Sequence, residues 1–309
     1  MRKIVITGAA GLVGQNLVAA LKTRPDVELL GIDKHRANIE LFRTIHPGVP
    51  IIEADLAVPG EWQHKFKDAD AVIVNQAQIG GLDEREFWRN NVDATKTVLD
   101  AIAQFNIPYF VGISSSVVRS KADDFYTRTK TAQEKLFDAS PIPHATLRPT
   151  LMFGWFDRKH LGWLRRFMEK TPVFPIPGTG KFQRQPLFAG DFVSVIIAAV
   201  DKRIVGTFDI SGQSKITYGE LIEEIHSIVR PRARIVRIPY RLFWGLLWTY
   251  ALFDRNPPFT VRQLEALVIP ETFPVIDWPQ IFDVPSTPLR DALTRTFLDA
   301  RYGNVALEF

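Results

Sequence analysis

The chain has 309 residues, of which 46% are hydrophobic and 23% charged, as is ordinary for a globular protein with one large domain or two smaller ones. Its net charge of +4 comes from scattered basic residues in short clusters, so we predict no nucleic-acid partner. The absence of cysteine excludes disulfides and thiolate chemistry and suits a reducing cytoplasm, where we expect the protein to reside. The six histidines show no ligand spacing, so we predict no metal site.

The first half of the chain alternates between two patterns. Apolar runs predict strands at 3–7, 27–32, 49–53, 71–75, 109–113 and 144–147, and helical spacing predicts helices at 12–22, 38–44, 85–105 and 126–137. Because the strands are continuous apolar runs between helices, they indicate a parallel sheet covered on both faces. The predicted fold class is therefore α/β, with a Rossmann-type doubly wound parallel sheet.

The pattern changes after Pro149. Prolines and aromatic residues crowd 155–177, and a helix at 191–200, a strand at 207–211 and a helix at 218–229 follow. We predict a first domain over 1–150 that also receives parts of 186–213. The remaining 151–309 are predicted to form mainly a smaller C-terminal cap that binds the substrate, with the site between the two parts.

The most apolar later stretch is 238–253, which is shorter than the ~20 residues that a membrane span needs and contains Arg241. It favours a buried or partner-facing helix over an interfacial membrane helix, and we predict no membrane contact. At the N-terminus, a short strand runs directly into a glycine turn, so we expect no signal peptide.

A glycine-rich turn follows the first predicted strand. Gly8, Gly11 and Gly14 have the spacing G-x-x-G-x-x-G, and Leu12 and Val13 start the helix. Small residues let the backbone approach a pyrophosphate, and the start of the helix offers free N–H groups to it. The turn therefore predicts a dinucleotide site.

An acidic residue completes this prediction. Asp33 ends the second strand, where a carboxylate accepts hydrogen bonds from the adenosine ribose. It favours NAD because it repels a 2′-phosphate, whereas Lys34 and Arg36 leave NADP open as the alternative. After the third strand, Asp55 and Leu56 are predicted at the adenine edge, and ordinary loop polarity competes as an explanation of Asp55. The first domain is thus predicted to bind NAD(P).

The fourth strand ends in a run of polar residues. Asn75, Gln76 and Ala77 are predicted to border the ribose and nicotinamide of the cofactor, and Gln78 to face the substrate. Ordinary loop polarity is the competing interpretation of Gln78.

A tyrosine and a lysine supply the predicted chemistry. Tyr126 and Lys130 are four residues apart and share one helix face. A phenol with a pKa near 10 is a poor base at neutral pH, and a neighbouring ammonium favours the phenolate. Ser116, or its neighbour Ser115, lies at the carboxyl edge of the sheet, where a hydroxyl can hold the substrate oxygen. The set predicts a Ser-Tyr-Lys site for hydride transfer, with Lys130 also contacting the cofactor, Ser116 catalytic and Ser115 contacting the substrate.

These motifs resemble an extended short-chain dehydrogenase/reductase of the NAD-dependent epimerase/dehydratase family, which acts on nucleotide sugars. The resemblance rests on the glycine turn, the acids that follow it, Asn91-Val92, the serine run, the Tyr–Lys pair and the 147–149 segment with Gly154. It implies that Asn91 joins the cofactor site and that Arg184, seven residues before Asp191, contacts a nucleotide diphosphate. It also implies hydride transfer at a sugar carbon and a homodimer formed through 85–105 and 124–139.

The departures from the family pattern narrow the reaction. Val117 and Val118 follow Ser116 where sugar dehydratases of the family carry Asp-Glu, so a 4-epimerase or 4-keto reductase is favoured over a dehydratase. Two alternatives stay open. The aromatic segment 238–253 suggests a dehydrogenase of a hydrophobic or lipid-linked alcohol, and the proline-rich 172–186 suggests a non-catalytic NAD(P)-binding accessory protein.

Overall fold

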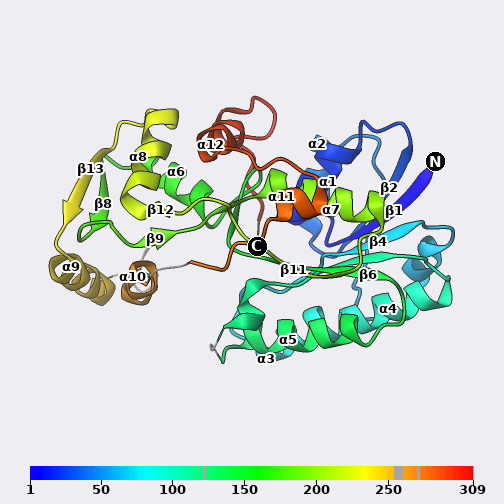
Figure 1. Cartoon of the computed structure of the whole chain (residues 1–309). Helices are drawn as coiled ribbons and strands as arrows, with labels where there is room; N and C mark the ends of the chain where they lie inside the picture. Colours follow the sequence, from blue (N-terminus) through cyan, green and yellow to red (C-terminus); the bar gives the residue numbers. More distant parts are fainter. Residues whose placement is uncertain (121–122, 254–259, 270–271, 309) are drawn as a thin grey trace.

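A parallel sheet forms the centre of the protein. The computed structural model describes residues 1–120, 123–253, 260–269 and 272–308, and these include a seven-stranded sheet with the order β11-β6-β5-β4-β1-β2-β3 (Figure 1). Its strands are β1 (Arg2–Thr7), β2 (Val27–Asp33), β3 (Ile51–Glu53), β4 (Ala71–Val74), β5 (Phe110–Ile113), β6 (His144–Pro149) and β11 (Gly206–Ile210). All neighbouring pairs are parallel. The order reverses beside β1, which is the Rossmann arrangement, so the predicted fold class is confirmed.

Helices cover both faces of this sheet (Figure 1). One face carries α1 (Leu12–Leu21), α2 (Arg36–Ile45) and α7 (Ala189–Lys202), and the other α4 (Ala94–Gln104) and α5 (Phe125–Asp138). Each face has its own hydrophobic core, with Leu17 and Phe192 in the first and Val98 and Phe137 in the second. A short 3-10 helix, η1 (Glu61–Phe66), buries Trp62 in the second core.

The helix predicted over 85–105 is interrupted. It consists of α3 (Glu84–Phe87), a π-helical turn η2 (Trp88–Asp93) and then α4. A π turn inserts an extra residue and turns side chains to new directions, often at functional sites. Here Asn91 is fully buried, and its side chain accepts from the Gln78 backbone N–H and donates to the Gln78 carbonyl. The prediction of one regular helix is wrong at this point because the turn adapts to the loop after β4.

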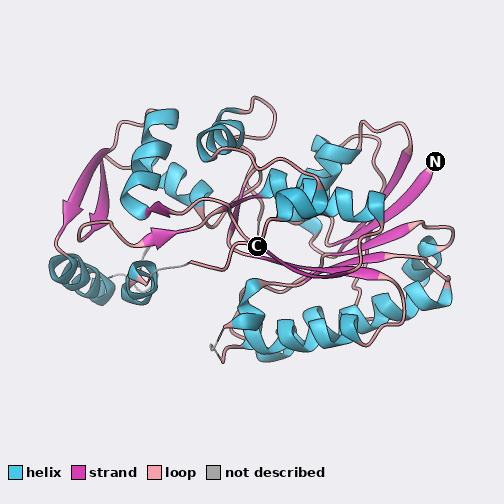
Figure 2. Cartoon of the chain, viewed as in Figure 1, coloured by secondary structure: helices cyan, strands magenta, loops and turns pink. Residues whose placement is uncertain are grey.

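A smaller cap lies beside the sheet domain, as Figure 2 shows. It contains α6 (Leu161–Lys170), β8 (Val173–Pro177), β9 (Gln183–Arg184), β12 (Ile216–Thr217), α8 (Tyr218–Val229), β13 (Arg234–Ile238), α9 (Tyr240–Phe253), α10 (Val261–Val268) and α12 (Leu289–Leu298). A third hydrophobic core holds α6, β8, α8 and α12 together.

The aromatic stretch expected to be a buried or partner-facing helix forms α9. Phe243 is buried, but Leu242, Leu246, Trp248 and Tyr250 are each about half exposed, so full burial is wrong and a partner-facing helix stays a prediction. None of the described helices is long and apolar enough to cross a membrane.

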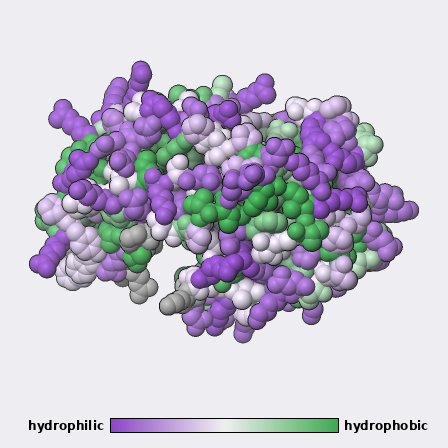
Figure 3. Space-filling model, viewed as in Figure 1, coloured by the Kyte–Doolittle hydropathy of each residue, from purple (hydrophilic) through white to green (hydrophobic). Residues whose placement is uncertain are grey.

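The two parts of the chain are interleaved. After the first cap segment, β10 (Leu187–Phe188) pairs with β7 (Met152–Phe153), and the chain then adds α7 and β11 to the sheet domain. Near the end, α11 (Trp278–Phe282) packs on the same hydrophobic core as α7. The last residues return to α2, where Asn38 exchanges two hydrogen bonds with the backbone of Glu308, of 2.8 and 2.9 Å. In Figure 3 the visible face is largely hydrophilic, with a hydrophobic band along its centre, where Figure 1 places α7 and α11.

Candidate active site

The glycine turn forms a close-packed backbone cradle between β1 and α1. Gly8 has a φ of +62°, and a Cβ on it would lie 2.9 Å from the backbone of Gln76. A Cβ on Gly14 would lie 2.5 Å from the Gly8 carbonyl oxygen. Gly11 directly precedes α1 in an extended conformation. The turn therefore accepts no side chains at Gly8 and Gly14, and it leaves the N-terminus of α1 open to an anionic group.

The Asp33 carboxylate lies at the end of β2 beside this cradle. It accepts hydrogen bonds from the backbone N–H groups of Ala10, Lys34 and His35 at 2.8 to 2.9 Å. Burial raises the pKa of Asp33, and the three N–H groups oppose that rise. The Lys34 ammonium points away from Asp33 to Asn90 Oδ1, at 2.7 Å. The carboxylate thus remains the prominent charge at the predicted ribose position.

The loop after β3 presents Asp55 and Leu56. Asp55 accepts from the Ala57 N–H at 3.0 Å and pairs with Arg89 of η2 at 2.5 Å, whereas Leu56 is buried in the second core. The pair between Asp55 and Arg89 therefore links this loop, which is predicted to border the adenine, to the π turn η2.

The loop after β4 is fastened to the glycine turn. Asn75 donates from Nδ2 to the Gly8 carbonyl at 3.1 Å, and the Thr7 hydroxyl donates to Gln76 Oε1 at 2.5 Å. Ala77 is exposed, and Gln78 is held by Asn91 through its backbone. The structure thus brings the predicted cofactor residues of β1, β4 and η2 to one edge of the sheet.

Tyr126 lies in the first turn of α5, and the Ser115 side chain lies near enough to its phenol to influence the pKa of Tyr126. Burial raises the pKa of Tyr126, the Ser115 side chain lowers it and the nearby Asp124 raises it. Ser116 instead begins a short 3-10 helix, η3 (Ser116–Arg119), whose start is capped by Ser115. Of the two serines, Ser115 is therefore the one placed against the tyrosine.

Lys130 is almost completely enclosed, with 1% of its surface exposed. Its ammonium donates to the Ile113 carbonyl at 2.8 Å and to Gln133 Oε1. Burial lowers the pKa of Lys130 to about 7, and the neighbouring Glu134 carboxylate opposes this shift. A lysine poised near neutral pH suits a role beside a phenol that gains and loses a proton.

A buried chain of polar side chains connects this lysine with the first strand. The Thr95 hydroxyl accepts from Gln76 Nε2 at 3.1 Å and from Gln133 Nε2 at 2.7 Å. Gln76 in turn binds Thr7, and Gln133 binds Lys130. Sequence reasoning missed Thr95 and Gln133. The sequence could have indicated Gln133, because it lies three residues after Lys130 on the same helix face. No sequence pattern indicates Thr95.

The comparisons with known proteins agree with this geometry. The model of the NAD dependent epimerase/dehydratase family matches residues 4–210. The chain belongs to that family. NAD is the cofactor of this NAD-dependent family member, and the residues present fit NAD. Gly8 and Gly14 leave room for a pyrophosphate, and Asp33 offers an acceptor for a ribose hydroxyl.

Curated relatives of this family member are distant. Ceramide reductase of Caulobacter vibrioides is 24% identical over 81% of this chain and 77% of that protein. UDP-glucose 4-epimerase of Vibrio cholerae is 20% identical over 82% of each. The Arabidopsis thaliana mitochondrial protein NADH dehydrogenase [ubiquinone] 1 alpha subcomplex subunit 9 is 24% identical over 76% of this chain, and the match spans only 60% of that subunit.

Solved structures share the fold. WbmH of Bordetella bronchiseptica, determined in complex with NAD+, superposes with a TM-score of 0.76 at 17% identity and covers 97% of this chain and 100% of that one. UDP-glucuronic acid 4-epimerase of Bacillus cereus, also in complex with NAD, gives a TM-score of 0.67 at 21% identity and covers 86% and 99%.

The predicted substrate residue Arg184 lies in β9 of the cap. Its guanidinium donates to the carbonyls of Leu267 and Ile269 at the end of α10, the latter at 2.9 Å. A cation at the C-terminus of a helix stabilises that helix. Arg184 thus has a structural role in this family member, and its contact with a diphosphate stays a prediction.

Proposed function

We propose that this protein is a nucleotide-sugar 4-epimerase or 4-keto reductase that works by hydride transfer at a carbinol carbon. The observation that carries the proposal is the Ser115 side chain lying close enough to the Tyr126 phenol to lower its pKa, at the carboxyl edge of the sheet. In open α/β sheets this edge is where ligands bind.

Each residue has a defined task in this proposal. Tyr126 takes the proton of the substrate hydroxyl and returns it, and Ser115, in place of Ser116, orients that hydroxyl. The charged form of Lys130 favours the phenolate. Bound NAD supplies the hydride acceptor in oxidation, and its reduced form supplies the donor in reduction.

The residues after the serines support epimerisation or reduction over dehydration. Loss of water needs an acid and a base beside the oxidised sugar. Val117 and Val118 occupy the turn after Ser116, and neither carries an ionisable group. The proposal therefore stops at hydride and proton transfer.

The proposal also covers the substrate and the assembly. A nucleotide sugar is favoured by the family and by Arg184, a cation on the cap. A homodimer is proposed through the stretch from α3 to α4 and through α5, which lie side by side on the outer face of the sheet domain (Figure 1).

The decisive experiment combines ligand identification with assays. Mass spectrometry of the purified protein should reveal bound NAD and a nucleotide sugar. An epimerase interconverts UDP-glucose or a related sugar without net NADH consumption, whereas a reductase consumes NADH with a 4-keto sugar. Tyr126→Phe should abolish either activity, and full activity in that variant would contradict the proposed role of Tyr126. Bound NAD with no turnover of any sugar by the unaltered protein would favour an accessory NAD-binding protein.

A second candidate function is a dehydrogenase of a hydrophobic or lipid-linked alcohol. The specific observation in its favour is the half-exposed apolar surface of α9. Steady NADH formation from a long-chain alcohol, with no turnover of any nucleotide sugar, would select this candidate.

A further inference from the structure

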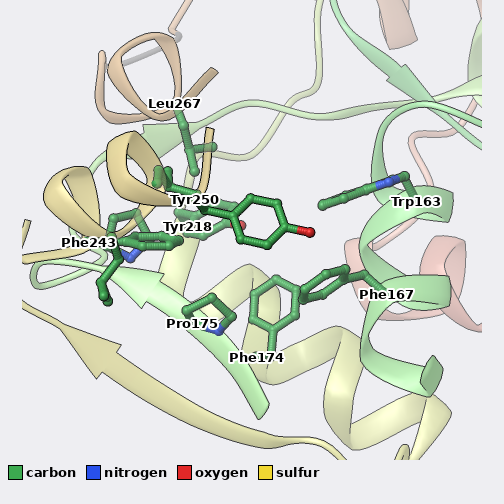
Figure 4. A pocket seen from close by; sticks show the side chains of 11 residues that line it. Trp163, Phe167, Phe174, Pro175, Tyr218, Phe243, Tyr250 and Leu267 are labelled. Carbon is green, nitrogen blue, oxygen red and sulfur yellow. The ribbon is translucent and has the colours of Figure 1, made fainter. Parts of the chain in front are cut away.

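An apolar cavity of about 350 Å³ lies within the cap (Figure 4), and its lining includes none of the residues of the proposed reaction. Its wall includes Trp163 and Phe167 of α6, Phe174 of β8, Phe243 of α9 and Leu267 of α10. None of the eleven described residues that line it carries a formal charge. Cavities of about 300–1,000 Å³ are typical of small-molecule sites, so this one is large enough to hold a ligand.

The helix α9 forms one side of this cavity and is poorly covered. Leu246 and Tyr250 line the cavity although 53% and 48% of their surfaces are exposed. Leu242 and Trp248 on the same helix are 55% and 52% exposed and do not belong to the lining. Contiguous apolar surface left in water marks an interaction site.

The lining selects an apolar ligand. Its polar side-chain atoms are the hydroxyls of Tyr218 and Tyr250 and the indole nitrogen of Trp163, and Figure 4 shows the Tyr250 ring lying between the other aromatic rings. A sugar or a nucleotide would leave many of its polar groups without partners there, which costs free energy. A hydrocarbon chain has no such groups and gains about 0.8 kcal/mol for each buried methylene.

A positive charge lies next to the cavity wall. The ring of Phe182 stacks on that of Tyr218 with centroids 5.0 Å apart, and the Arg184 guanidinium lies 5.2 Å from the Phe182 centroid. The same guanidinium donates to the carbonyl of Leu267, which lines the cavity. The combination of an apolar cavity and an adjacent cation fits an amphiphile with an anionic head group.

We infer that the cap cavity binds the hydrocarbon chain of a single lipid molecule with an anionic head, a ligand distinct from NAD. The occupant is one chain and not a bilayer surface, because the lining comes from five elements that enclose a space behind α9. A bilayer would also touch the exposed side chains of α9 that do not line the cavity, Leu242 and Trp248. This inference does not depend on the reaction proposed above.

The helix offers a matched pair of substitutions for the test. Binding of dodecanoic acid to the detergent-free, full-length protein is measured by isothermal titration calorimetry below the micelle concentration. Leu246→Asp places a charge in the cavity and should weaken binding at least tenfold. Leu242→Asp, on the same helix and equally exposed, should change it less than twofold. Tyr250→Asp and Trp248→Asp form a second such pair, and thermal unfolding checks that all four variants fold.

Three results would overturn the inference. The first is the absence of saturable dodecanoate binding to the unaltered protein, and the second is an equal loss in Leu246→Asp and Leu242→Asp. The third is binding only to phosphatidylglycerol vesicles, lost in Leu242→Asp and Trp248→Asp, which would assign α9 to a membrane surface. Because these measurements need no turnover, failure of the proposed reaction would leave them unaffected.

Discussion

At the scale of single residues, Lys130 is the side chain whose properties the fold changes most. Enclosure lowers its pKa to about 7, although the ammonium has two hydrogen-bond acceptors and a nearby carboxylate. Near neutral pH, part of the population therefore carries an uncharged lysine beside Tyr126. The support that this ammonium gives to a phenolate weakens as the pH rises above 7.

Lys130→Met should change how stability depends on pH. The pKa of Lys130 is lower in the folded than in the unfolded protein, so the unfolded chain binds more protons between about pH 7 and 10.5. This group should therefore increase the free energy of unfolding of the unaltered protein as the pH rises through that window. Relative to the unaltered protein, the variant should lose about 4 kcal/mol of stability between pH 6 and pH 10, because only the unaltered protein gains from this group over that range. Urea unfolding at pH 6, 8 and 10 measures this, and parallel pH profiles for the two proteins would contradict it.

Alanine substitutions can distinguish the roles of Ser115 and Ser116. Ser115→Ala removes the hydroxyl next to Tyr126 and should lower kcat by about 10²–10³, the usual effect of losing one positioned donor. Ser116→Ala, on the first residue of η3, should lower it less than tenfold. Steady-state kinetics with the substrate found by mass spectrometry decides this. An equal or larger loss in Ser116→Ala would make Ser116 the catalytic hydroxyl.

At the scale of elements, α5 carries both Tyr126 and Lys130, the groups proposed to take part in the reaction. Its N-cap is Asp124, whose carboxylate accepts from the Thr127 N–H at 2.7 Å. This cap starts the helix two residues before Tyr126 and places Lys130 one turn further along the same face. The same carboxylate raises the pKa of Tyr126. Asp124 therefore positions the tyrosine and at the same time disfavours its phenolate form.

Two substitutions at Asp124 separate these effects. Asp124→Ala removes the cap and should cost about 1 kcal/mol of stability. Asp124→Asn keeps a capping oxygen but removes the negative charge, so the pKa of Tyr126 should fall and the rising limb of the pH–rate profile should move to lower pH. Urea unfolding and pH–rate profiles measure the two effects. A profile of Asp124→Asn displaced to higher pH would contradict this assignment.

The elements themselves could largely be predicted from periodicity. The helix expected at 218–229 has those bounds, and the strands of the sheet begin and end within two residues of expectation. The predictions of element boundaries fail where strand pairing or contacts with distant segments decide them. β3 starts at Ile51 instead of residue 49, because its ladder with β2 runs from Ile51 to Glu53. The π turn of η2 depends on Asn91 meeting the loop after β4, a contact that no local pattern encodes.

At the scale of the whole molecule, the last residues join the cap to the sheet domain. Leu307 and Tyr302 are buried against Phe156, and Ala306 forms a β-bridge with Phe156. Together with the pair between Asn38 and Glu308, this tail crosses from the end of the cap back to α2. It therefore restrains the two parts between which the substrate is proposed to bind.

Leu307→Ala tests this restraint. Loss of a buried leucine side chain should cost about 2–4 kcal/mol, because a cavity is left beside Phe156. Glu308→Ala is the control, since the Glu308 side chain is exposed and only its backbone pairs with Asn38; we expect a change below about 0.5 kcal/mol. Thermal unfolding measures both, and equal effects of the two substitutions would show that the tail does not restrain the domains.

The sequence by itself determined the α/β class, the glycine turn followed by Asp33, and the placement of Tyr126 and Lys130 four residues apart on one helix. Such features depend on short spacings and local backbone preferences, which the order of residues states directly. Only the tertiary structure decided that Ser115 meets Tyr126, that Gln133 and Thr95 hold Lys130, and that α9 opens onto an apolar cavity. These depend on contacts between elements far apart in the chain, where packing and burial choose among side chains that look equivalent in sequence.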